Sequence, residues 1–324
     1  MIEEILKIRD LRVEYKTDLE TIYAVNGINL NIEKGKTLGI VGETGAGKTT
    51  TALSILRLLP ERSAIIRSGS IEFKGKKLFD LSEERMSRSI RGEKISMIFQ
   101  DPMTSLNPVI RVGDQILEML QLHNYKKMSQ EGMGKRVDEL LRMVGIEAKR
   151  KNEYPHQFSG GMRQRVVIAI ALACEPEILI ADEPTTALDV TIQDQVLNMI
   201  NNLKTKFNMS MILITHDLGV VVNTCDNVAI MYAGEIIEYG TIENIFETGY
   251  HHPYTEGLFG SIPKINDKRN RLNPIPGSMP DPSKLPAGCS FYMRCPKHMD
   301  ICKSKKPQER DINETHFIKC HLFK

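Results

Sequence analysis

Residues 42–49 have the types and the spacing of a phosphate-binding loop. They read Gly42-Glu43-Thr44-Gly45-Ala46-Gly47-Lys48-Thr49 and match G-x-x-x-x-G-K-S/T without departure. Glycines let consecutive backbone N–H groups surround a phosphate, and Lys48 adds positive charge at the β- and γ-phosphates. The hydroxyl of Thr49 is placed to bind Mg²⁺. The loop, with Thr50 directly after it, therefore predicts a site for a magnesium–nucleoside triphosphate.

Two adjacent carboxylates follow an apolar run at residues 178–181. Asp182 is placed to bind Mg²⁺ through water, since this ion prefers oxygen ligands and keeps part of its water shell. Glu183 is one residue further along, where it can polarise an attacking water as a general base. A polar exit from a strand is common, so the pair gains its meaning from the complete phosphate loop in the same chain.

Two further polar residues also follow apolar runs. Gln100 comes after residues 95–99, and its amide can reach both the metal and the water. His216 comes after residues 211–215, where its imidazole can contact the γ-phosphate and orient the water. Neither residue alone would be strong evidence. With Glu183 they form the expected catalytic set, and Thr49, Gln100 and Asp182 form the expected magnesium ligands.

A second phosphate-binding helix start is expected at Ser159-Gly160-Gly161. Ser159 is suited to cap the helix, because its hydroxyl can accept backbone N–H groups of the first turn. The two glycines leave that helix end bare, so its N–H groups can approach a phosphate closely. Gln164 lies in the same turn of sequence. An ordinary helix start containing glycine is the alternative interpretation.

Regular elements must position these residues. Apolar runs at 37–41, 95–99, 178–181 and 211–215 predict buried strands, and each run ends at one of the polar sites. Helices are expected at 50–59, after Ser159, and at 109–122 and 137–144, with a polar loop at 126–135. Residues 101–108 contain two prolines and an asparagine, which predict a turn-rich loop.

The order of these motifs resembles that of the nucleotide-binding subunits of ABC transporters over roughly residues 1–245, which implies a nucleotide-binding domain at 1–249. Six motifs occur in sequence: the loop 42–49, Gln100, Ser159 to Gln164, Asp182-Glu183, Ala187-Leu188-Asp189 and His216. The resemblance implies an α/β P-loop ATPase with a RecA-like core, an antiparallel β subdomain and a helical subdomain at about 103–170. It also implies two subunits packed head to tail, with each ATP between one P-loop and the other subunit's Ser159-Gly160-Gly161.

The same resemblance assigns further roles. Asp189 is expected to bridge the two ATP sites, and an aromatic residue near the N-terminus to stack on adenine. Tyr15 is the first choice for this stack and Tyr23 the second. The loop 101–108 and the helices after it are expected to dock the membrane subunits, with a plain surface loop as the alternative. Phe158 and Met162 replace the Leu and Gln common in the family, and we expect no loss of hydrolysis from this.

Composition indicates a soluble chain of about two domains. The chain has 324 residues, net charge +2 and 41% hydrophobic residues, without an apolar run near the roughly 18 residues of a membrane span. A signal-peptide core is not evident at residues 1–10. We expect a peripheral protein on the cytoplasmic face of the membrane. From residue 251 onward, basic residues outnumber acidic ones by six, yet no interleaved basic and aromatic platform favours nucleic acid.

A proline- and cysteine-rich extension is expected at residues 250–324. Its cysteines Cys289, Cys295, Cys302 and Cys320 follow the spacing C-x5-C-x6-C-x17-C. Disulfides are disfavoured in a reducing cytoplasm. The wide spacing and the Cys295-Pro296 pair favour a structural 4Fe–4S cluster; zinc and unliganded thiols are the alternatives. Cys174 and Cys225 are expected to be buried and inert.

The extension and the loop 101–108 together resemble the peptide and nickel branch of ABC importers, across essentially the whole chain. This resemblance implies an ATPase for dipeptide or oligopeptide uptake, with a paralogous or identical ATPase, two membrane permease subunits and an extracytoplasmic peptide-binding protein. Nickel import is the nearest alternative. A soluble ABC ATPase acting on nucleic acid or ribosomes, or a metal-sensing regulator, would be a different class of function.

Overall fold

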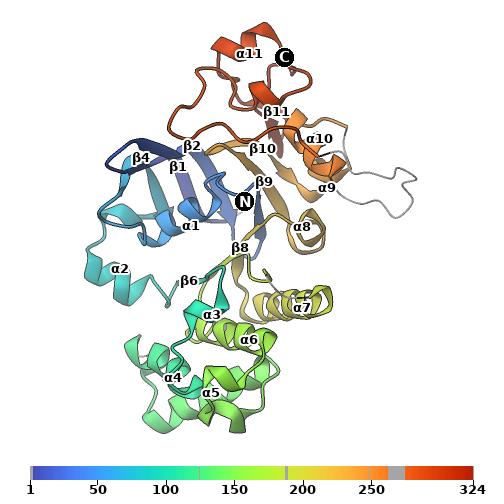
Figure 1. Cartoon of the computed structure of the whole chain (residues 1–324). Helices are drawn as coiled ribbons and strands as arrows, with labels where there is room; N and C mark the ends of the chain where they lie inside the picture. Colours follow the sequence, from blue (N-terminus) through green and yellow to red (C-terminus); the bar gives the residue numbers. More distant parts are fainter. Residues whose placement is uncertain (1–2, 124, 187–188, 248, 262–273, 324) are drawn as a thin grey trace. The chain divides into compact units, whose positions relative to one another are not determined.

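The computed structural model describes all residues except 1–2, 124, 187–188, 248, 262–273 and 324 (Figure 1). The chain divides into two compact units. One comprises residues 1–3, 32–37 and 78–214 and is called the carboxylate unit, since it contains Asp182 and Glu183. The other comprises residues 4–31, 38–77 and 215–324 and is called the P-loop unit.

Parallel strands form the centre of the carboxylate unit. They are β6 (Ile95–Ile98), β7 (Ile178–Asp182) and β8 (Ser210–Thr215), in the order β6-β7-β8. Every residue of the three strands is buried, as the continuous apolar runs predicted. The predicted strands are confirmed, and Asp182 stands at the carboxyl end of β7.

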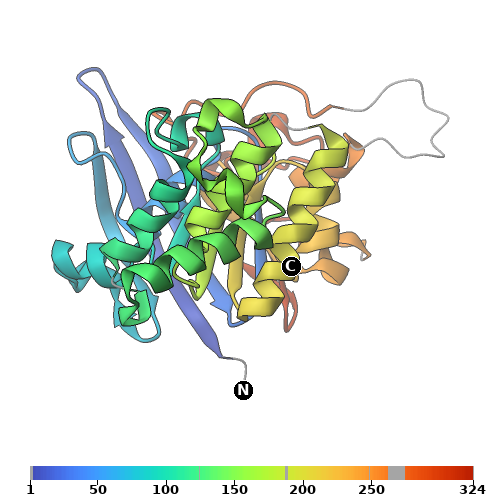
Figure 2. The ribbon, with the colours of Figure 1, turned by 90° about the horizontal axis from the view of Figure 1, so that it is seen from below.

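Helices make up most of the rest of the carboxylate unit. Helices α4, α5 and α6 contact one another and appear in green in Figure 1, and α7 lies against α6, as Figure 2 shows from below. The helices are α2 (Glu83–Ser89), α3 (Pro102–Ser105), α4 (Val112–Leu122), α5 (Gln130–Met143), α6 (Gly160–Ala171) and α7 (Val190–Phe207), with the 3-10 turns η1 (Leu78–Asp80), η2 (Tyr125–Lys127), η3 (Ala148–Asn152) and η4 (Pro155–Gln157).

Two expectations for this region were wrong. Helix α5 begins at Gln130, inside the segment 126–135 that was expected to be a loop. Ser129 caps this helix by accepting the Gly132 N–H, and this cap offsets the poor helix propensity of the glycines in the first turns. The turn-rich segment 101–108 contains the one-turn helix α3, whose proline stands at the first helical position, where it is tolerated.

The P-loop unit contains an antiparallel sheet and a second, mixed set of strands. The first sheet has the order β2-β1-β4-β5, from β1 (Glu4–Lys16), β2 (Thr21–Glu33), β4 (Ala64–Phe73) and β5 (Lys76–Lys77). The second set has the order β11-β12-β10-β9-β3, from β3 (Thr37–Val41), β9 (Asn227–Tyr232), β10 (Glu235–Thr241), β11 (Arg310–Asn313) and β12 (His316–Ile318). Only β3 and β9 are parallel among these neighbours. The C-terminal strands therefore extend the sheet that carries the P-loop.

The extension shares its core with the P-loop strand. Tyr254 and Phe291 are fully or almost fully buried in a cluster with Val41, Ile230 and Tyr232, so this part of the extension packs against the strand that precedes the P-loop. The helical elements of this unit are α1 (Lys48–Leu56), α8 (Leu218–Thr224), α9 (Ile242–Phe246), α10 (Pro253–Gly260), η5 (Tyr292–Arg294) and α11 (Asp300–Ser304).

Candidate functional site

The P-loop connects β3 to α1, as the sequence predicted. Its glycines are needed because other backbone segments lie close by. A Cβ on Gly42 would be 2.1 Å from the Met231 carbonyl oxygen. Gly47 has φ +101°, and its Cβ would be 2.4 Å from the Ala24 carbonyl oxygen. Any side chain at either position would displace the loop.

The side chain of Lys48 folds back along the P-loop. Its ammonium group donates to the carbonyl oxygens of Gly42 at 2.7 Å and Glu43 at 3.0 Å, and the residue is 6% exposed. Thr44, Gly45 and Thr49 are exposed, whereas Ala46 is buried. The loop thus presents polar groups at its surface while its lysine holds the backbone, an arrangement suited to receiving phosphate oxygens.

Two residues of the extension hold Glu43, which the sequence predicted only as a loop member. The Arg294 guanidinium donates to both carboxylate oxygens, at 3.1 and 3.0 Å. The Tyr254 hydroxyl accepts the Glu43 backbone N–H at 3.0 Å. Sequence reasoning missed both partners, because they lie more than two hundred residues after the loop and belong to no local motif.

The two aromatic residues considered for adenine differ in their surroundings. Tyr15 is half-buried in β1, and its hydroxyl is 3.2 Å from the Thr50 hydroxyl at the start of α1. Tyr23 is 38% exposed, and its backbone N–H donates to the Pro282 carbonyl oxygen. Tyr15 is therefore the one in contact with the helix that follows the P-loop.

The carboxylate unit brings Gln100 and Glu183 together. The Gln100 amide donates to the Glu183 carboxylate at 2.9 Å, and the Thr186 hydroxyl donates to the same oxygen at 3.1 Å. Glu183 has φ +46°, and its N–H donates to the Ile214 carbonyl oxygen at 2.9 Å. A left-handed conformation is unfavourable for glutamate, so the surrounding contacts hold the side chain in a defined direction. Asp182, directly before it, is 2% exposed.

The second predicted phosphate-binding helix start also lies in the carboxylate unit. Ser159 caps α6 by accepting the Met162 N–H, as predicted. Asp189 caps α7 by accepting the Ile192 N–H at 3.0 Å. Ser159, Gly160, Gly161 and Asp189 line one hollow of about 650 Å³. Ala187 and Leu188, which precede Asp189 in its motif, lie outside the described residues.

Two predicted site residues are placed differently from these. Gln164 is 1% exposed, and neither end of its amide has a hydrogen-bond partner among the described residues. It is not among the residues that line the hollow. His216 comes directly after β8, where the chain enters the P-loop unit, and it is exposed. Asp217 beside it caps α8. The predicted residues are therefore collected into two sets, one in each unit.

The four cysteines of the extension lie near one another. The Cys289 N–H donates to the Cys302 carbonyl oxygen at 2.8 Å, and Cys302 is within electrostatic range of the other three thiols. Burial raises the pKa of Cys289 to about 12 and that of Cys320 to about 11. In the part of the chain that the structure describes, no group of three or more His, Cys, Asp or Glu is arranged to hold a metal ion.

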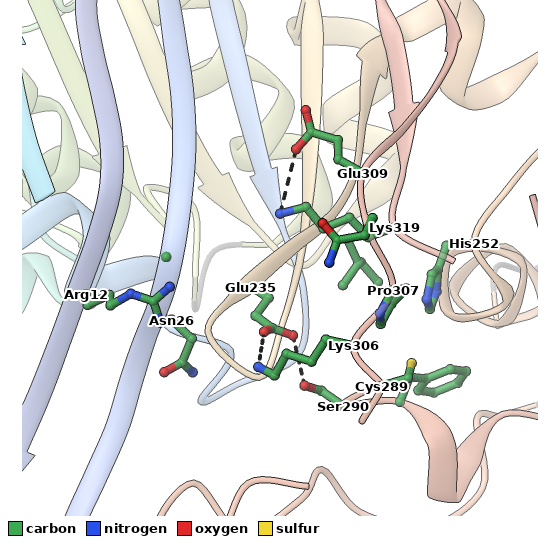
Figure 3. A pocket seen from close by; sticks show the side chains of 14 residues that line it. Arg12, Asn26, Glu235, His252, Cys289, Ser290, Lys306, Pro307, Glu309 and Lys319 are labelled. Atoms are coloured by element: carbon green, nitrogen blue, oxygen red, sulfur yellow. Dashed lines mark hydrogen bonds and ion pairs between the residues drawn. The ribbon is translucent and has the colours of Figure 1, made fainter. Parts of the chain in front are cut away.

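A pocket of about 300 Å³ opens beside Cys289, where the extension meets β10 (Figure 3). Lys306 forms an ion pair with Glu235, and the Ser290 hydroxyl donates to the same carboxylate at 2.9 Å. The pocket is thus a polar seam whose charges tie the extension to the sheet.

Glu238 provides a second, buried attachment. It is fully buried in β10 and accepts hydrogen bonds from His251, His316 and Thr255 and from the His252 N–H. Burial alone would raise the pKa of Glu238, but these donors outweigh it and lower the pKa to about 2. His316 comes from β12 and the other donors from α10 and the residues before it, so one carboxylate joins three segments.

Comparisons with known proteins agree with this geometry. A family model described as "ABC transporter" matches residues 25–186, and one described as "Oligopeptide/dipeptide transporter, C-terminal region" matches residues 237–302. The solved dimeric ATP-binding cassette MJ0796, in a post-hydrolysis state with ADP and Pi, is 30% identical with a TM-score of 0.65, over 73% of this chain and 98% of that one. The chain belongs to the ABC transporter family and is an ABC-type ATPase with an α/β P-loop fold.

Its branch within the family follows from full-length relatives. The chain is 50% identical over 323 residues to the dipeptide transport ATP-binding protein DppD of Bacillus subtilis (strain 168), covering 99% of this chain and 95% of the relative. It is 48% identical over 324 residues to the oligopeptide transport ATP-binding protein OppD of the same organism, covering 99% and 89%. The chain belongs to this group of peptide-transport ATP-binding proteins. No helix in its described residues is long and apolar enough to span a membrane.

Proposed function

We propose that this chain hydrolyses ATP to drive uptake of dipeptides or oligopeptides through an ABC importer. The main support is its 50% identity over 99% of the chain to a dipeptide transport ATP-binding protein, together with the matched C-terminal region. These relatives favour peptide import over action on nucleic acid or ribosomes. The proposed partners are a second ATPase subunit, two membrane permease subunits and an extracytoplasmic peptide-binding protein, with this chain on the cytoplasmic face.

We assign the reaction steps to the two halves of the centre. Loop residues 42–49 and Thr50 hold the phosphates, Tyr15 stacks on adenine, and Thr49, Gln100 and Asp182 hold Mg²⁺. Glu183 accepts the proton of the attacking water, held in direction by Gln100 and Thr186. His216 contacts the γ-phosphate. Ser159, Gly160 and Gly161 complete the site of the neighbouring ATPase subunit, where Asp189 lines the same hollow.

The experiment is uptake into vesicles that contain the reconstituted permease, with this chain, its partner ATPase and the binding protein. We expect ATP-dependent accumulation of a labelled dipeptide or of a longer peptide, and none with the Lys48→Ala variant. Accumulation of Ni²⁺ without either peptide would overturn the proposed cargo. ATPase activity that needs no permease and responds to RNA would overturn the proposed class of function.

We further propose that Cys289, Cys295, Cys302 and Cys320, which lie near one another but are not arranged to hold a metal ion in the described structure, close around a structural 4Fe–4S cluster. Backbone N–H groups of Phe291, Lys297 and Leu322 hydrogen-bond to the sulfurs of Cys289, Cys295 and Cys320, each two residues earlier. Such N–H donors stabilise thiolates around a metal, whose charge would also offset the burial that raises the thiol pKa. A Cβ on Gly288 would be 2.2 Å from the Cys302 carbonyl oxygen, so glycine is needed where these cysteine segments meet.

Anaerobic purification followed by metal analysis tests the cluster. We expect about four irons per chain and broad absorbance near about 400 nm. Cys320→Ser is expected to lose the iron, whereas Cys174→Ser, a buried cysteine outside the set, keeps it. One zinc per chain without iron, or no metal, would overturn the iron–sulfur assignment.

A further inference from the structure

The extension reaches the P-loop itself, and both of its contacts are to Glu43. Arg294 pairs with the Glu43 carboxylate through one guanidinium nitrogen, at 3.1 and 3.0 Å from the two oxygens. Tyr254 accepts the backbone N–H of the same residue at 3.0 Å. The first turn of the loop is therefore held through side chain and backbone by residues from the last quarter of the chain.

Arg294 is held firmly at its own position. Its side chain is 6% exposed, its Nε donates to the Pro276 carbonyl oxygen at 2.9 Å, and Nη1 donates to the Tyr232 hydroxyl at 3.3 Å. Burial opposes its charge, but hydrogen bonds to Glu43 and Tyr232 leave its pKa raised. A guanidinium fixed in this way presents a constant positive charge to the loop.

An aromatic triangle connects Arg294 and Tyr254 to the strand behind the loop. The ring centroids of Tyr232 and Tyr254 are 4.7 Å apart, those of Tyr232 and Phe291 5.3 Å, and those of Tyr254 and Phe291 5.5 Å. All three residues are fully or almost fully buried. Phe291 and Arg294 lie between Cys289 and Cys295, so the conformation of this cysteine segment determines where the guanidinium sits.

Charge explains why this matters for nucleotide. Glu43 lies in a loop that receives a polyphosphate, and an unpaired carboxylate there repels the ligand. Its pairing with a buried arginine offsets that repulsion and fixes the carboxylate against the guanidinium. The Glu43 carboxylate is only 31% exposed, which limits screening by solvent.

We propose that Arg294 is a positioning residue of the nucleotide site, which makes the ATP affinity of the P-loop depend on the fold of the segment from Cys289 to Cys295. The inference rests on the ATP-binding role of the loop. It extends that role by making the C-terminal extension part of the phosphate site. A change in what the cysteines hold is then transmitted to Glu43 through Arg294.

A double-mutant cycle on the full chain tests the proposal, with MgATP dissociation constants as the readout. Arg294→Met is expected to weaken MgATP binding about tenfold, because it leaves the Glu43 charge unpaired. In the Glu43→Gln background the same change is expected to cost only about twofold. Arg310→Met, an exposed arginine of the extension, is the matched control and leaves affinity unchanged. An equal loss in both backgrounds, or no loss, would overturn the proposal.

Two milder variants keep the test decisive where Arg294→Met misfolds. Arg294→Lys keeps the charge but loses the fixed geometry, and is expected to weaken binding about threefold. Tyr254→Phe removes only the acceptor of the Glu43 N–H and should speed hydrogen exchange of that amide. Unchanged affinity and unchanged exchange in both variants would also overturn the proposal.

Cys295→Ser tests transmission from the cysteine segment. We expect it to weaken MgATP binding in the wild-type background and to have little further effect after Arg294→Met. Equal effects in the two backgrounds would show that the segment acts by another route. Failure of the proposed function would appear instead as wild-type chain that does not bind MgATP or does not support peptide uptake, so the two failures are distinguishable.

Discussion

The two sets of candidate site residues, one in each unit, are held in different ways. In the carboxylate unit, Glu183 is held by Gln100 and Thr186, which both lie within the region matched by the ABC transporter model. In the P-loop unit, the loop is positioned by distant segments, including Arg294 and Tyr254 of the extension. The proposed catalytic residues are thus held within the ABC transporter region, whereas the P-loop is held in part by residues of the separately matched C-terminal region. The difference predicts that hydrolysis and nucleotide binding can be impaired separately.

The largest expected effect comes from Glu183→Gln. Loss of the general base should lower ATP turnover about 10³-fold, because proton transfer from the attacking water is no longer assisted. MgATP affinity should stay near the wild-type value, and the ATP-bound dimer should accumulate. Turnover by phosphate release and dimerisation by light scattering measure the two effects. Wild-type turnover would show that Glu183 is not the general base. A loss of MgATP affinity would show that hydrolysis and nucleotide binding cannot be impaired separately.

Gly160→Tyr should have the next largest effect. Outside its own helix backbone, no described residue has an atom within 4 Å of a Cβ at Gly160, so a side chain fits there but fills the hollow that we propose faces a neighbouring nucleotide. We expect turnover to fall about 10²-fold through loss of charge-stabilising donors, with MgATP binding by the isolated chain intact. Gly134→Tyr is the control, since a Cβ there is equally unobstructed.

Mixing variants shows on which chain the hollow acts. If this chain pairs with itself, mixing the Gly160→Tyr and Glu183→Gln variants should restore turnover. In a mixed dimer, one of the two composite sites combines the intact Glu183 of one chain with the intact Gly160 of the other. Turnover that does not rise on mixing such pairs would mean that Ser159 and Gly160 serve their own chain. The hollow would then act on the nucleotide of its own chain and not on that of its neighbour.

The same contrast explains what the sequence could predict. Strands β3, β7 and β8 and the Ser159 cap were predicted because apolar runs and capping residues are local signals. The start of α5 was missed because the two glycines at 132 and 134 favoured a loop, although Ser129 caps the helix. Arg294, Tyr254 and Glu238 were not predicted as site or anchor residues, because their partners lie in segments that only the folded chain brings together.

The smallest expected effect, on stability, comes from Glu238→Gln. A carboxyl whose pKa falls from 4.5 when unfolded to about 2 when folded stabilises the fold above pH 4.5, by about 3 kcal/mol for a shift of this size. This contribution is lost as the pH falls from 4.5 towards 2. The amide keeps part of the hydrogen bonding, so we expect about 2 kcal/mol lower unfolding free energy at pH 7 and a shrinking difference below pH 4.

Urea unfolding at several pH values measures this difference, with Glu309→Gln as the control. Glu309 is 43% exposed in its ion pair with Lys319, and its loss should change the unfolding free energy by less than about 0.5 kcal/mol. A Glu238→Gln effect that is the same at pH 7 and pH 3 would show that packing, and not charge, anchors the extension. Glu238 forms its hydrogen bonds with His251, His252, Thr255 and His316, which belong to the extension, so the variant also separates anchoring from positioning. At pH 7 and low temperature, the MgATP affinity of Glu238→Gln should stay at the wild-type value, whereas Arg294→Met weakens it about tenfold.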